Sequence, residues 1–350
     1  MDLICPLCHT LSPPNTVNLW ALRRSNNHLR CSNPSCPGRY PLQPYPIIIR
    51  EPGRVVAHFA ELPDFGSLSV TGRVLSTLPE DSTLLAVLRK RSTYLWAHYH
   101  DLLPEDYRPD FVHPAPFTQR ALDLLSEVKL PEHPRALVAG CGPGREALEL
   151  AARLRRSGAD DARVVACDID PALLSCLDTL RREGSLEALL RGSVDLWRSP
   201  EPIVLGAPLR EAAEDVELVC ADILDPPFPP GSFDLIVALN LLDNVTDPLA
   251  LLNQLNLQLR PGGLLLLSSP FAWHERITPR DKRLAFAVPH ARMEDRMLLE
   301  KLLTGAIPLG YGPPMTFRSL ATDRLTWHLR VHDTHYQTYL PPLALWRKDG

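Results

Sequence analysis

The sequence has 350 residues, of which 45% are hydrophobic and 22% are charged, and its formal net charge is −4. This composition is that of a globular protein, and the length suggests one large domain with a smaller one beside it. The net charge gives the whole chain no broad attraction to nucleic acid, and no apolar run approaches the roughly 20 residues that span a membrane. Because the start also lacks a signal-peptide pattern, we expect a cytoplasmic protein without a membrane partner.

Four of the eight cysteines form two closely spaced pairs near the start of the chain. Cys5 and Cys8 are separated by two residues. Cys31 and Cys36 are separated by four residues. Each pair can close a tight turn with both sulfur atoms facing one point, and two such turns make a tetrahedral thiolate site of the kind that holds a structural zinc ion. The spacing therefore predicts one zinc site, and four free thiols are the alternative.

The residues after the second cysteine pair support this interpretation. Tyr40-Pro41-Leu42 is followed by Tyr45-Pro46-Ile47-Ile48-Ile49-Arg50. Together with the cysteines, this segment resembles the small zinc-ribbon activators that serve tRNA and translation-factor methyltransferases. The resemblance implies a zinc-ribbon domain over residues 1–52, with a structural or recognition role. His9 and His28 are reserve ligands, since four cysteines already complete the site.

The next segment contains short apolar clusters with helical spacing. We interpret residues 53–115 as a helical connector between the ribbon and a larger domain over residues 116–350. The aromatic stretch from Tyr94 to His100 could cover a substrate pocket, and its alternative role is packing in the core.

A glycine-rich turn joins the first strand of the larger domain to a helix. The apolar run at 135–139 predicts a buried strand, and apolar residues between 146 and 154 predict the helix. Glycines in the turn between them let the backbone approach a ligand closely. The dinucleotide fingerprint is absent, because the third glycine follows the second by two positions rather than three. We expect the turn to bind a cofactor through Gly140, Cys141, Gly142 and Gly144.

Polar residues follow the next three predicted strands, which lie at 163–167, 216–220 and 233–239. Asp168 stands where a carboxylate can accept both ribose hydroxyls of a nucleoside. Asp170 is the structural alternative, as the N-cap of the following helix. Asp222 can accept the amino group of an adenine. The predicted cofactor-binding residues of these strands are Asp168, Ile169, Asp222, Ile223 and Asn240.

These positions, followed by Pro261-Gly262-Gly263 before a fifth strand, resemble the class I S-adenosylmethionine-dependent methyltransferase family. The resemblance implies an α/β, Rossmann-like sheet of seven strands with helices on both faces. S-adenosyl-L-methionine would lie across the carboxyl ends of the first strands. Residues 325–331 and 336–346 would form the last two strands, paired antiparallel. The interval from 182 to 216 exceeds the usual crossover, so we expect an inserted helix or hairpin around Asp195 to Arg198.

Two further stretches bear on the substrate. Asn240-Leu241-Leu242-Asp243-Asn244 and Ser269-Pro270-Phe271-Ala272-Trp273-His274-Glu275 resemble the methyltransferase domain of ovothiol biosynthesis, which methylates a ring nitrogen of a mercaptohistidine. That family has an arginine at the position of Asn244 and an acidic pair before Thr278, so the match is partial. The resemblance implies a small imidazole- or thiol-bearing methyl acceptor.

Roles for individual residues follow from the chemistry of such an acceptor. A neutral imidazole with a pKa near 6.5 already offers a lone pair at neutral pH, so no strong base is required. Asn240 could orient a ring N–H, and Asp243 could hold a substrate ammonium group. Phe271 and Trp273 could stack on a flat ring or a cation. The structural alternatives are that Asp243 caps a helix and that Trp273 belongs to the core.

Two other functions stay open on the sequence alone. One is an RNA methyltransferase (for a ribosomal or transfer RNA base) or a protein methyltransferase that uses the zinc ribbon for recognition. The first 52 residues contain five arginines against Asp2 and Glu51, which is a weak basic patch. The other is a catalytically idle partner subunit, against which the intact cofactor positions argue. We favour the small-molecule acceptor.

Overall fold

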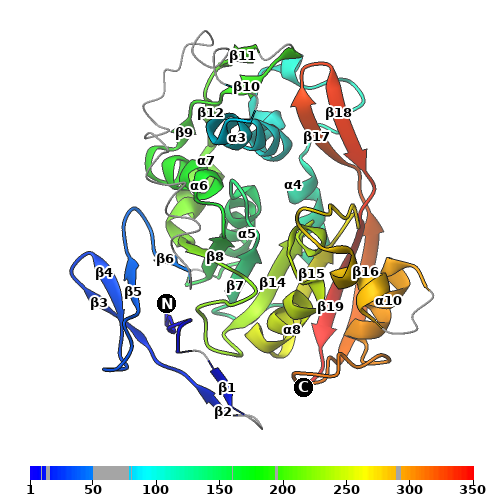
Figure 1. Cartoon of the computed structure of the whole chain (residues 1–350). Helices are drawn as coiled ribbons and strands as arrows, with labels where there is room; N and C mark the ends of the chain where they lie inside the picture. Colours follow the sequence, from blue (N-terminus) through cyan, green and yellow to red (C-terminus); the bar gives the residue numbers. More distant parts are fainter. Residues whose placement is uncertain are drawn as a thin grey trace.

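The structure is a computed structural model in which residues 1–8, 10–12, 16–49, 79, 81–159, 161–193, 196–288 and 293–350 are described. Its centre is an eight-stranded sheet of order β16-β19-β15-β14-β7-β8-β13-β6 (Figure 1). β19 runs antiparallel to both of its neighbours, and the other adjacent strands pair in parallel. The strands are β6 (Ile47–Ile48), β7 (Arg135–Ala139), β8 (Arg163–Asp168), β13 (Val216–Ala221), β14 (Phe233–Leu239), β15 (Leu259–Ser268), β16 (Phe317–Arg324) and β19 (Pro342–Lys348).

The middle strands are apolar along their whole length because both faces of the sheet are covered. All seven residues of β14 are buried, as are four of the five residues of β7. Parallel strands covered on both sides read as continuous apolar runs, which is why these segments could be predicted. Along β7, Ala136 and Val138 enter one hydrophobic core, and Leu137 and Ala139 enter the other. The α/β, Rossmann-like fold class is confirmed, and the sheet has eight strands where seven were expected.

Helices supply the two layers that flank the sheet. The first core contains side chains of α3, α5 and α6, and the second contains side chains of α8 and α10 together with the N-terminal ribbon. Among the described residues, no helix is both long and apolar enough to cross a membrane. The helices are α3 (Thr83–Tyr99), α4 (Phe117–Ala121), α5 (Arg145–Arg156), α6 (Pro171–Glu183), α7 (Ala207–Ala212), α8 (Pro248–Gln258), α9 (Leu284–Ala287) and α10 (Asp295–Leu303). Short 3₁₀ helices span His100–Leu102, Glu105–Tyr107, Leu122–Leu125, Ala213–Asp215, Leu242–Asn244 and Arg280–Lys282.

Local signals fix where α6 begins. The Asp170 side chain accepts hydrogen bonds from the backbone N–H groups of Ala172 and Leu173, at 2.9 and 3.3 Å. Pro171 occupies the first helical position, where a missing N–H costs nothing. The predicted N-cap role of Asp170 is thus confirmed, and α6 starts directly beside the end of β8.

The N-terminal segment forms its own small sheet before it joins the central one. β3 (Leu22–Ser25), β4 (His28–Cys31) and β5 (Arg39–Pro41) make a three-stranded antiparallel sheet. β1 (Thr10–Ser12) and β2 (Thr16–Asn18) form a separate antiparallel pair. β6 then pairs in parallel with β13, with Ile47 opposite Cys220. The chain from the ribbon therefore supplies the edge strand of the central sheet.

The described part of the predicted connector consists mainly of the helix α3. Ser82 is its N-cap and accepts a hydrogen bond from the Leu85 N–H at 3.5 Å. Residues 53–78 and 80 of the predicted connector lie outside the described residues. In Figure 1, α3 lies across the sheet from the ribbon, close to the insertion after α6 and to the hairpin of β17 and β18.

The long interval after α6 contains the expected hairpin. β9 (Ser185–Leu186) pairs with β12 (Ile203–Val204), and β10 (Leu190–Arg191) pairs with β11 (Trp197–Arg198), both antiparallel. The Trp197 side chain is buried against Leu85 and Leu88 of α3. Asp195 lies outside the described residues. The insertion thus packs against α3 rather than extending the central sheet.

One expectation about the last strands is wrong. Residues 325–331 do not enter the central sheet, because β17 (Trp327–His332) pairs with β18 (His335–Tyr339) in a hairpin of its own. The sheet instead takes β16, which pairs with β19. β16 is largely exposed, so its sequence lacks the apolar signal that β17 has. Trp327 and Leu329 of β17 are buried in the same core as α3.

Candidate functional site

A cavity of about 550 Å3 lies at the carboxyl ends of four neighbouring strands. Its wall includes residues at or just after the ends of β7, β8, β13 and β14. β7 separates β8 from β14, so the strand order reverses at this point. Ligands of open α/β sheets bind at such a position. The predicted residues that line the cavity are Gly140, Gly142, Asp168, Ile169, Asp222, Ile223 and Asn240.

The turn between β7 and α5 forms one side of the cavity. Gly140, Gly142 and Gly144 have φ values of +68°, +52° and +87°, which residues with side chains rarely adopt. A Cβ atom on Gly140 would lie 2.6 Å from Leu241 Cδ1, so close packing also requires glycine there. Gly144 is the N-cap of α5, and Cys141 is fully buried. The cavity therefore meets the backbone of Gly140 and Gly142 rather than the whole predicted loop.

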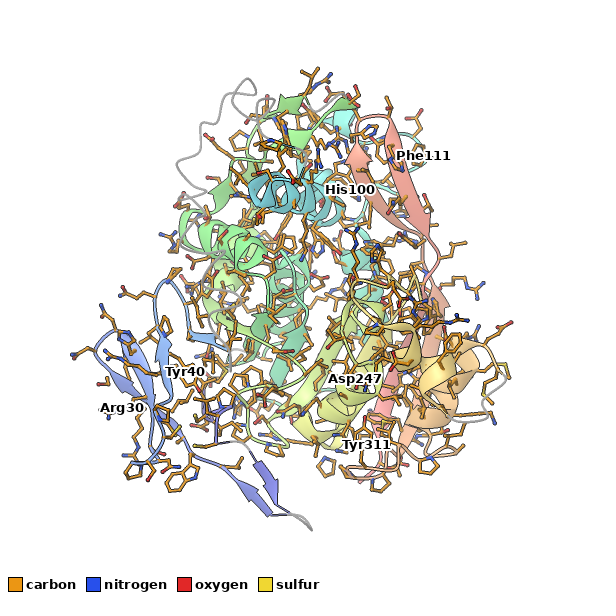
Figure 2. The ribbon with its side chains drawn as sticks, in the orientation of Figure 1. Arg30, Tyr40, His100, Phe111, Asp247 and Tyr311 are labelled. Atoms are coloured by element: carbon orange, nitrogen blue, oxygen red, sulfur yellow. The ribbon has the colours of Figure 1, made fainter. Side chains whose placement is uncertain are left out.

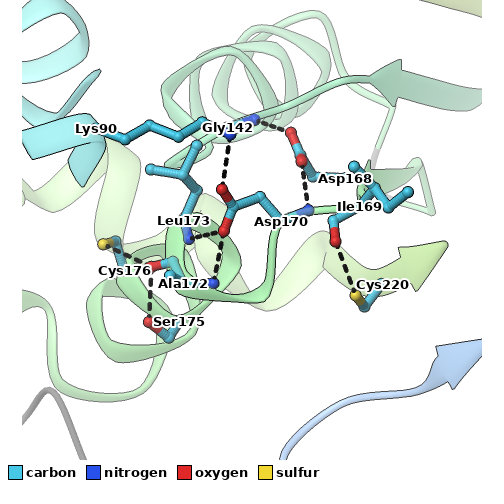
Figure 3. A network of polar contacts seen from close by, with 10 residues as sticks. All are labelled: Lys90, Gly142, Asp168, Ile169, Asp170, Ala172, Leu173, Ser175, Cys176 and Cys220. Atoms are coloured by element: carbon cyan, nitrogen blue, oxygen red, sulfur yellow. Dashed lines mark hydrogen bonds and ion pairs between the residues drawn. The ribbon is translucent and has the colours of Figure 1, made fainter. Parts of the chain in front are cut away.

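Asp168 holds the glycine turn and faces the cavity at the same time. Its Oδ2 accepts a hydrogen bond from the Gly142 N–H at 2.7 Å, and its Oδ1 accepts one from the Asp170 N–H at 2.8 Å (Figure 3). Burial raises the pKa of the Asp168 carboxyl, the Asp170 carboxylate raises it further, and Lys90 opposes both. Since a carboxylate has about four acceptor positions, both oxygens can still accept ribose hydroxyls.

The end of β13 adds an acceptor with apolar neighbours. Asp222 Oδ1 accepts a hydrogen bond from the Leu224 N–H at 2.9 Å, and burial raises the pKa of the Asp222 carboxyl. Ile223 beside it is buried. Ile169 lines the same cavity and is 46% exposed, which is high for a large apolar side chain. Ile169 and Asp222 thus place an apolar side chain and an acceptor on the wall of one cavity.

Asn240 has a strained backbone at the end of β14. Its φ is +52°, which is uncommon for a residue other than glycine. The Asn240 N–H donates to the Ser268 carbonyl at 2.9 Å, and Ser268 Oγ donates to Asn240 Oδ1 at 3.0 Å. Strain of this kind is concentrated at functional sites. These bonds hold the Asn240 side chain against the cavity.

Another part of the cavity wall comes from α3. Tyr94 and His98, one turn apart, line the cavity, whereas Trp96 and Tyr99 are fully buried in the core. His98 Nδ1 lies 3.2 Å from Oε2 of Glu146 in α5, and both side chains are buried. The aromatic stretch thus contributes side chains to the cavity wall and to the core, the two roles that its sequence allowed. Which residues of the stretch face the cavity and which face the core could not be assigned from sequence alone.

Several cavity residues carry no sequence motif. Phe117 and Thr118 of α4 line the cavity together with Trp327 of β17, and the Phe117 and Trp327 rings have centroids 6.3 Å apart. Lys90 of α3 also lines the cavity, and its Nζ pairs with Asp170 Oδ2 at 2.7 Å. Long-range packing brings these segments together, and a local pattern does not reveal such packing. Among these residues, only the aromatic ones have a signal in the sequence.

Three of the residues predicted to contact the methyl acceptor, which are Asp243, Phe271 and Trp273, do not line this cavity. Asp243 is 2% exposed, and its oxygens accept hydrogen bonds from Ser269 Oγ at 3.2 Å and from the Ala272 N–H at 2.8 Å. Phe271 lines a different cavity, of about 230 Å3, near α10. Trp273 Nε1 donates to Asp295 Oδ2 at 2.7 Å. In this structure the three side chains order the segment after β15.

The four N-terminal cysteines come together as their spacing predicts. Their sulfur atoms all lie within 4.8 Å of one another. Cys5 Sγ is 3.8 Å from Cys36 Sγ, and Cys31 Sγ is 3.8 Å from Cys8 Sγ. Backbone N–H groups also point at the sulfurs, with Gly38 donating to Cys36 at 3.3 Å. A cluster of four sulfurs at this spacing fits a tetrahedral thiolate site.

His28 and His9 do not complete this cluster among the described residues. His28 Nδ1 lies 3.4 Å from Arg39 Nη2. His9 lies outside the described residues. Among the described residues, the candidate ligands are therefore the four cysteines.

Comparison with known proteins agrees with this geometry. Residues 137–267 match a family model described as a methyltransferase domain. No curated protein matches the chain. Solved structures with a similar fold include an S-adenosylmethionine-dependent methyltransferase from Methanosarcina mazei, with 20% identity over 63% of this chain and 94% of that one, and a TM-score of 0.38.

Two further matches are a solved structure of an S-adenosylmethionine-dependent methyltransferase from Aquifex aeolicus and that of the [4+2]-cyclase SpnF. The Aquifex protein has 13% identity over 76% of this chain and 98% of that one, with a TM-score of 0.39. SpnF has 14% identity over 75% of this chain and 97% of that one, with a TM-score of 0.41. These scores are too low to support an inference about substrate.

Residues 137–267 thus match a methyltransferase domain, and the cavity lies at the carboxyl ends of its strands; these findings support an S-adenosylmethionine-dependent methyltransferase as the class of enzyme. The cavity fits the cofactor on two observations. Asp168 presents a half-buried carboxylate beside the turn, where Gly140 and Gly142 have no side chains to block a ligand. Asp222 and Ile169 offer an acceptor and an apolar surface for a base.

Proposed function

We propose that this enzyme transfers the methyl group of S-adenosyl-L-methionine to a nitrogen of a small imidazole- or thiol-bearing molecule. The observation that carries the proposal is the size and wall of the cavity. Its volume of about 550 Å3 has to hold both cofactor and acceptor. Small-molecule pockets have volumes of roughly 300–1,000 Å3 and mostly apolar walls with a few polar groups. A small planar acceptor fits this description.

In the proposed complex, the cofactor lies along the ends of the strands. Asp168 accepts the ribose hydroxyls, Asp222 accepts the adenine amino group, and Ile169 with Ile223 covers the base. The backbone of Gly140 and Gly142 lies next to the remaining part of the cofactor. Cys141 and Gly144 shape the turn without lining the cavity. When bound, the cofactor supplies a methyl group on a positively charged sulfur.

The acceptor is proposed to occupy the part of the cavity bounded by aromatic side chains. Tyr94, Phe117 and Trp327 line it, and their faces can attract a flat ring or a cation. Asn240 can orient a ring N–H or a ring nitrogen through its amide. Methyl transfer is an in-line displacement, so alignment of the nucleophile accounts for most of the catalysis. Asp243, Phe271 and Trp273 act only by holding the loops that surround this region.

The His98 and Glu146 pair gives the site a place for a proton. Methylation of a neutral nitrogen through its lone pair gives a cationic product, and this product must then lose a proton to become neutral. The His98 ring lies within 4 Å of the position that a Cβ on Gly142 would occupy, at the edge of the cavity. We propose that the ring takes up this proton and that Glu146, 3.2 Å away, stabilises the resulting imidazolium.

For the N-terminal ribbon we propose a structural zinc ion held by Cys5, Cys8, Cys31 and Cys36. The support is the mutual distance of the four sulfurs and the N–H groups directed at them. Zinc in such a site carries no open position for chemistry. We further propose that residues 1–52 are a ribbon domain, 53–115 a connector and 116–350 the methyltransferase domain.

A screen with radiolabelled cofactor tests the proposed substrate class. Purified full-length protein is incubated with three separate pools: small metabolites, total RNA, and protein extract. We expect label in the small-metabolite pool, with Asp168→Ala as a variant that loses it and Asp323→Ala, at an exposed position in β16, as the matched control. Label in RNA or protein alone would replace the proposed acceptor. Failure of the folded protein to bind labelled cofactor would overturn the proposed activity as a whole.

A further inference from the structure

The outer face of the ribbon carries a row of arginines that the methyl-transfer site does not use. In the three-stranded sheet, Arg23 of β3 stands directly opposite Arg30 of β4, and Arg30 stands opposite Arg39 of β5. All three side chains are exposed. Figure 2 shows Arg30 on the side of the ribbon that faces away from the central sheet. Three like charges thus line up across the sheet on one face.

This arrangement has a cost within the protein. Side chains directly opposite in an antiparallel pair have Cβ atoms about 4.5–5.5 Å apart, and like charges at that distance are destabilising. Within the described part of the chain, no ion pair joins Arg23, Arg30 or Arg39 to an acidic residue. The closest polar partner is His28, whose Nδ1 is 3.4 Å from Arg39 Nη2. Nothing described in the ribbon offsets the repulsion.

The opposite face of the same sheet keeps the row in place. Side chains alternate between the two faces of a strand, so Leu29, Cys31 and Tyr40 point the other way and are buried. Tyr40 hydroxyl lies 3.3 Å from Cys5 Sγ, within the cysteine cluster. The arginines therefore lie on a sheet that is held rigid by the four-cysteine site and the second core. Such preorganisation lowers the cost of ordering them on a partner.

The chemistry of the face favours a chain of anionic groups. A guanidinium group binds phosphate or carboxylate with two parallel hydrogen bonds, which a lysine cannot do. Ser25 and His28 pair at the end of the row and can reach a ribose 2′-hydroxyl, the group that distinguishes RNA from DNA. A protein partner would need an apolar centre to pack on, and a lipid surface would need apolar side chains to insert. The exposed side chains on this face of β3, β4 and β5 are Arg23, Ser25, Arg30 and Arg39, which offer neither.

We propose that the outer face of the ribbon, formed by Arg23, Arg30, Arg39, Ser25 and His28, binds single-stranded RNA through its phosphates. The surface is separate from the cavity, so this binding goes beyond the proposed reaction and does not require RNA to be the methyl acceptor. It assigns the ribbon a recognition role in addition to its structural one. The net charge of −4 conceals this role because the positive charge is concentrated in one small sheet.

Fluorescence anisotropy with the full-length protein and a labelled single-stranded RNA of mixed sequence tests the proposal. Three phosphate contacts predict that log Kobs falls with log salt concentration with a slope of about −2, from roughly 0.7 per contact on a single strand. The variant R23E/R30E/R39E should lose binding by at least about tenfold and lose this slope. The matched control, R156E/R318E/R324E, changes the charge equally at exposed positions outside the ribbon. Zinc content shows that each variant keeps its ribbon folded.

Several outcomes would overturn the proposal. RNA affinity of the triple ribbon variant equal to that of the parent would exclude the arginine row. Equal binding of polyglutamate would identify an acidic protein as the partner, and equal binding of anionic vesicles would identify a lipid surface. Equal binding of DNA of the same sequence would exclude the 2′-hydroxyl contact. Transfer of labelled methyl to the bound RNA would overturn the small-molecule acceptor while leaving the RNA surface intact.

Discussion

The N-terminal ribbon and the cofactor crevice both present their functional groups on tight turns, but different interactions hold the two turns in place. In the ribbon, the turns at Cys5 and Cys31 pack on Leu29 and Tyr40, which join the second core at its edge. In the crevice, the turn at Gly140 follows β7, which is buried on both faces by two extensive cores. A small domain cannot bury enough apolar surface to be stable alone, whereas a large sheet can. We therefore expect the ribbon to depend on the proposed cross-link and the crevice to be stable without it.

The two regions meet at β6. Ile48 is 1% exposed, and β6 pairs with β13, the strand that leads to Asp222. The Tyr45 hydroxyl donates to the Pro171 carbonyl at 2.9 Å, at the start of α6. The join is thus short but buried, so each region can influence the other through the edge of the sheet.

The largest effect is expected from removing the cross-link, because its loss should separate the two regions. Cys8→Ser combined with Cys36→Ser should abolish zinc binding and unfold the ribbon, since zinc in such small domains contributes about 10–16 kcal/mol. Zinc content and limited proteolysis of residues 1–49 measure this. Cofactor binding should persist, because the crevice has its own core. Cys176→Ala, in α6, is the control that should keep full zinc content. Loss of cofactor binding together with zinc would show that the regions are not independent.

A smaller effect is expected from weakening the join itself. Ile48→Ala leaves a cavity between the ribbon and β13 and should lower the free energy of unfolding by roughly 2–5 kcal/mol. We expect the thermal transition of the ribbon to separate from that of the sheet, which calorimetry with the zinc-loaded protein would detect. Ile307→Ala, at a partly buried position, is the matched control. A single unchanged transition would mean that β6 contributes little to the contact.

Next in size is the loss of one buried acceptor in the crevice. Asp168→Ala should weaken cofactor binding by about 1.5–3 kcal/mol, the range for hydrogen bonds to a charged group, with zinc content unchanged. Isothermal titration of the parent protein, the variant and Asp323→Ala measures this. An unchanged affinity would remove Asp168 from the proposed cofactor site.

The pH dependence of the same residue follows from its raised pKa. Because the folded pKa lies above the ordinary value of about 3.9, Asp168 becomes protonated before exposed carboxyls do as the pH falls. Cofactor affinity should fall through this window, and Asp168→Asn should flatten the profile. For the stability of the protein without cofactor, the pH dependence has the opposite direction. Its stability decreases as the pH rises from the ordinary to the raised pKa, since the folded state then binds more protons than the unfolded state.

Sequence alone could predict those parts of both regions that depend on local signals. The cysteine spacing indicates the cluster, and a strand buried on both faces reads as an apolar run that ends beside Asp168 or Asn240. The glycine turn has a local signature because positive φ values require glycine. These features lie within a few residues of one another along the chain. For this reason, the fold class and most of the proposed cofactor contacts could be predicted from the sequence.

The rest of the cavity wall depends on contacts between distant segments. Tyr94 and Trp96 lie in one aromatic stretch, yet the first faces the cavity and the second is buried. Trp327 reaches the wall because β17 leaves the central sheet and packs on α3. Phe271 and Trp273 have the composition of an acceptor site but lie elsewhere. An apolar or aromatic residue carries the same local signal in a core and in a pocket wall, so only tertiary packing distinguishes the two.

The smallest expected effect concerns the ion pair between α3 and the start of α6. Lys90 Nζ lies 2.7 Å from Asp170 Oδ2, but the Lys90 side chain is 49% exposed, so water and salt screen the pair. Such pairs contribute about 0–1 kcal/mol, and Lys90→Ala should therefore change cofactor affinity by less than roughly fivefold. Titrations at low and high salt should show the difference shrinking as salt rises, with Lys301→Ala on α10 as the control. A loss as large as that of Asp168→Ala would mean that Lys90 binds the cofactor directly, because no screened surface pair accounts for an effect of that size.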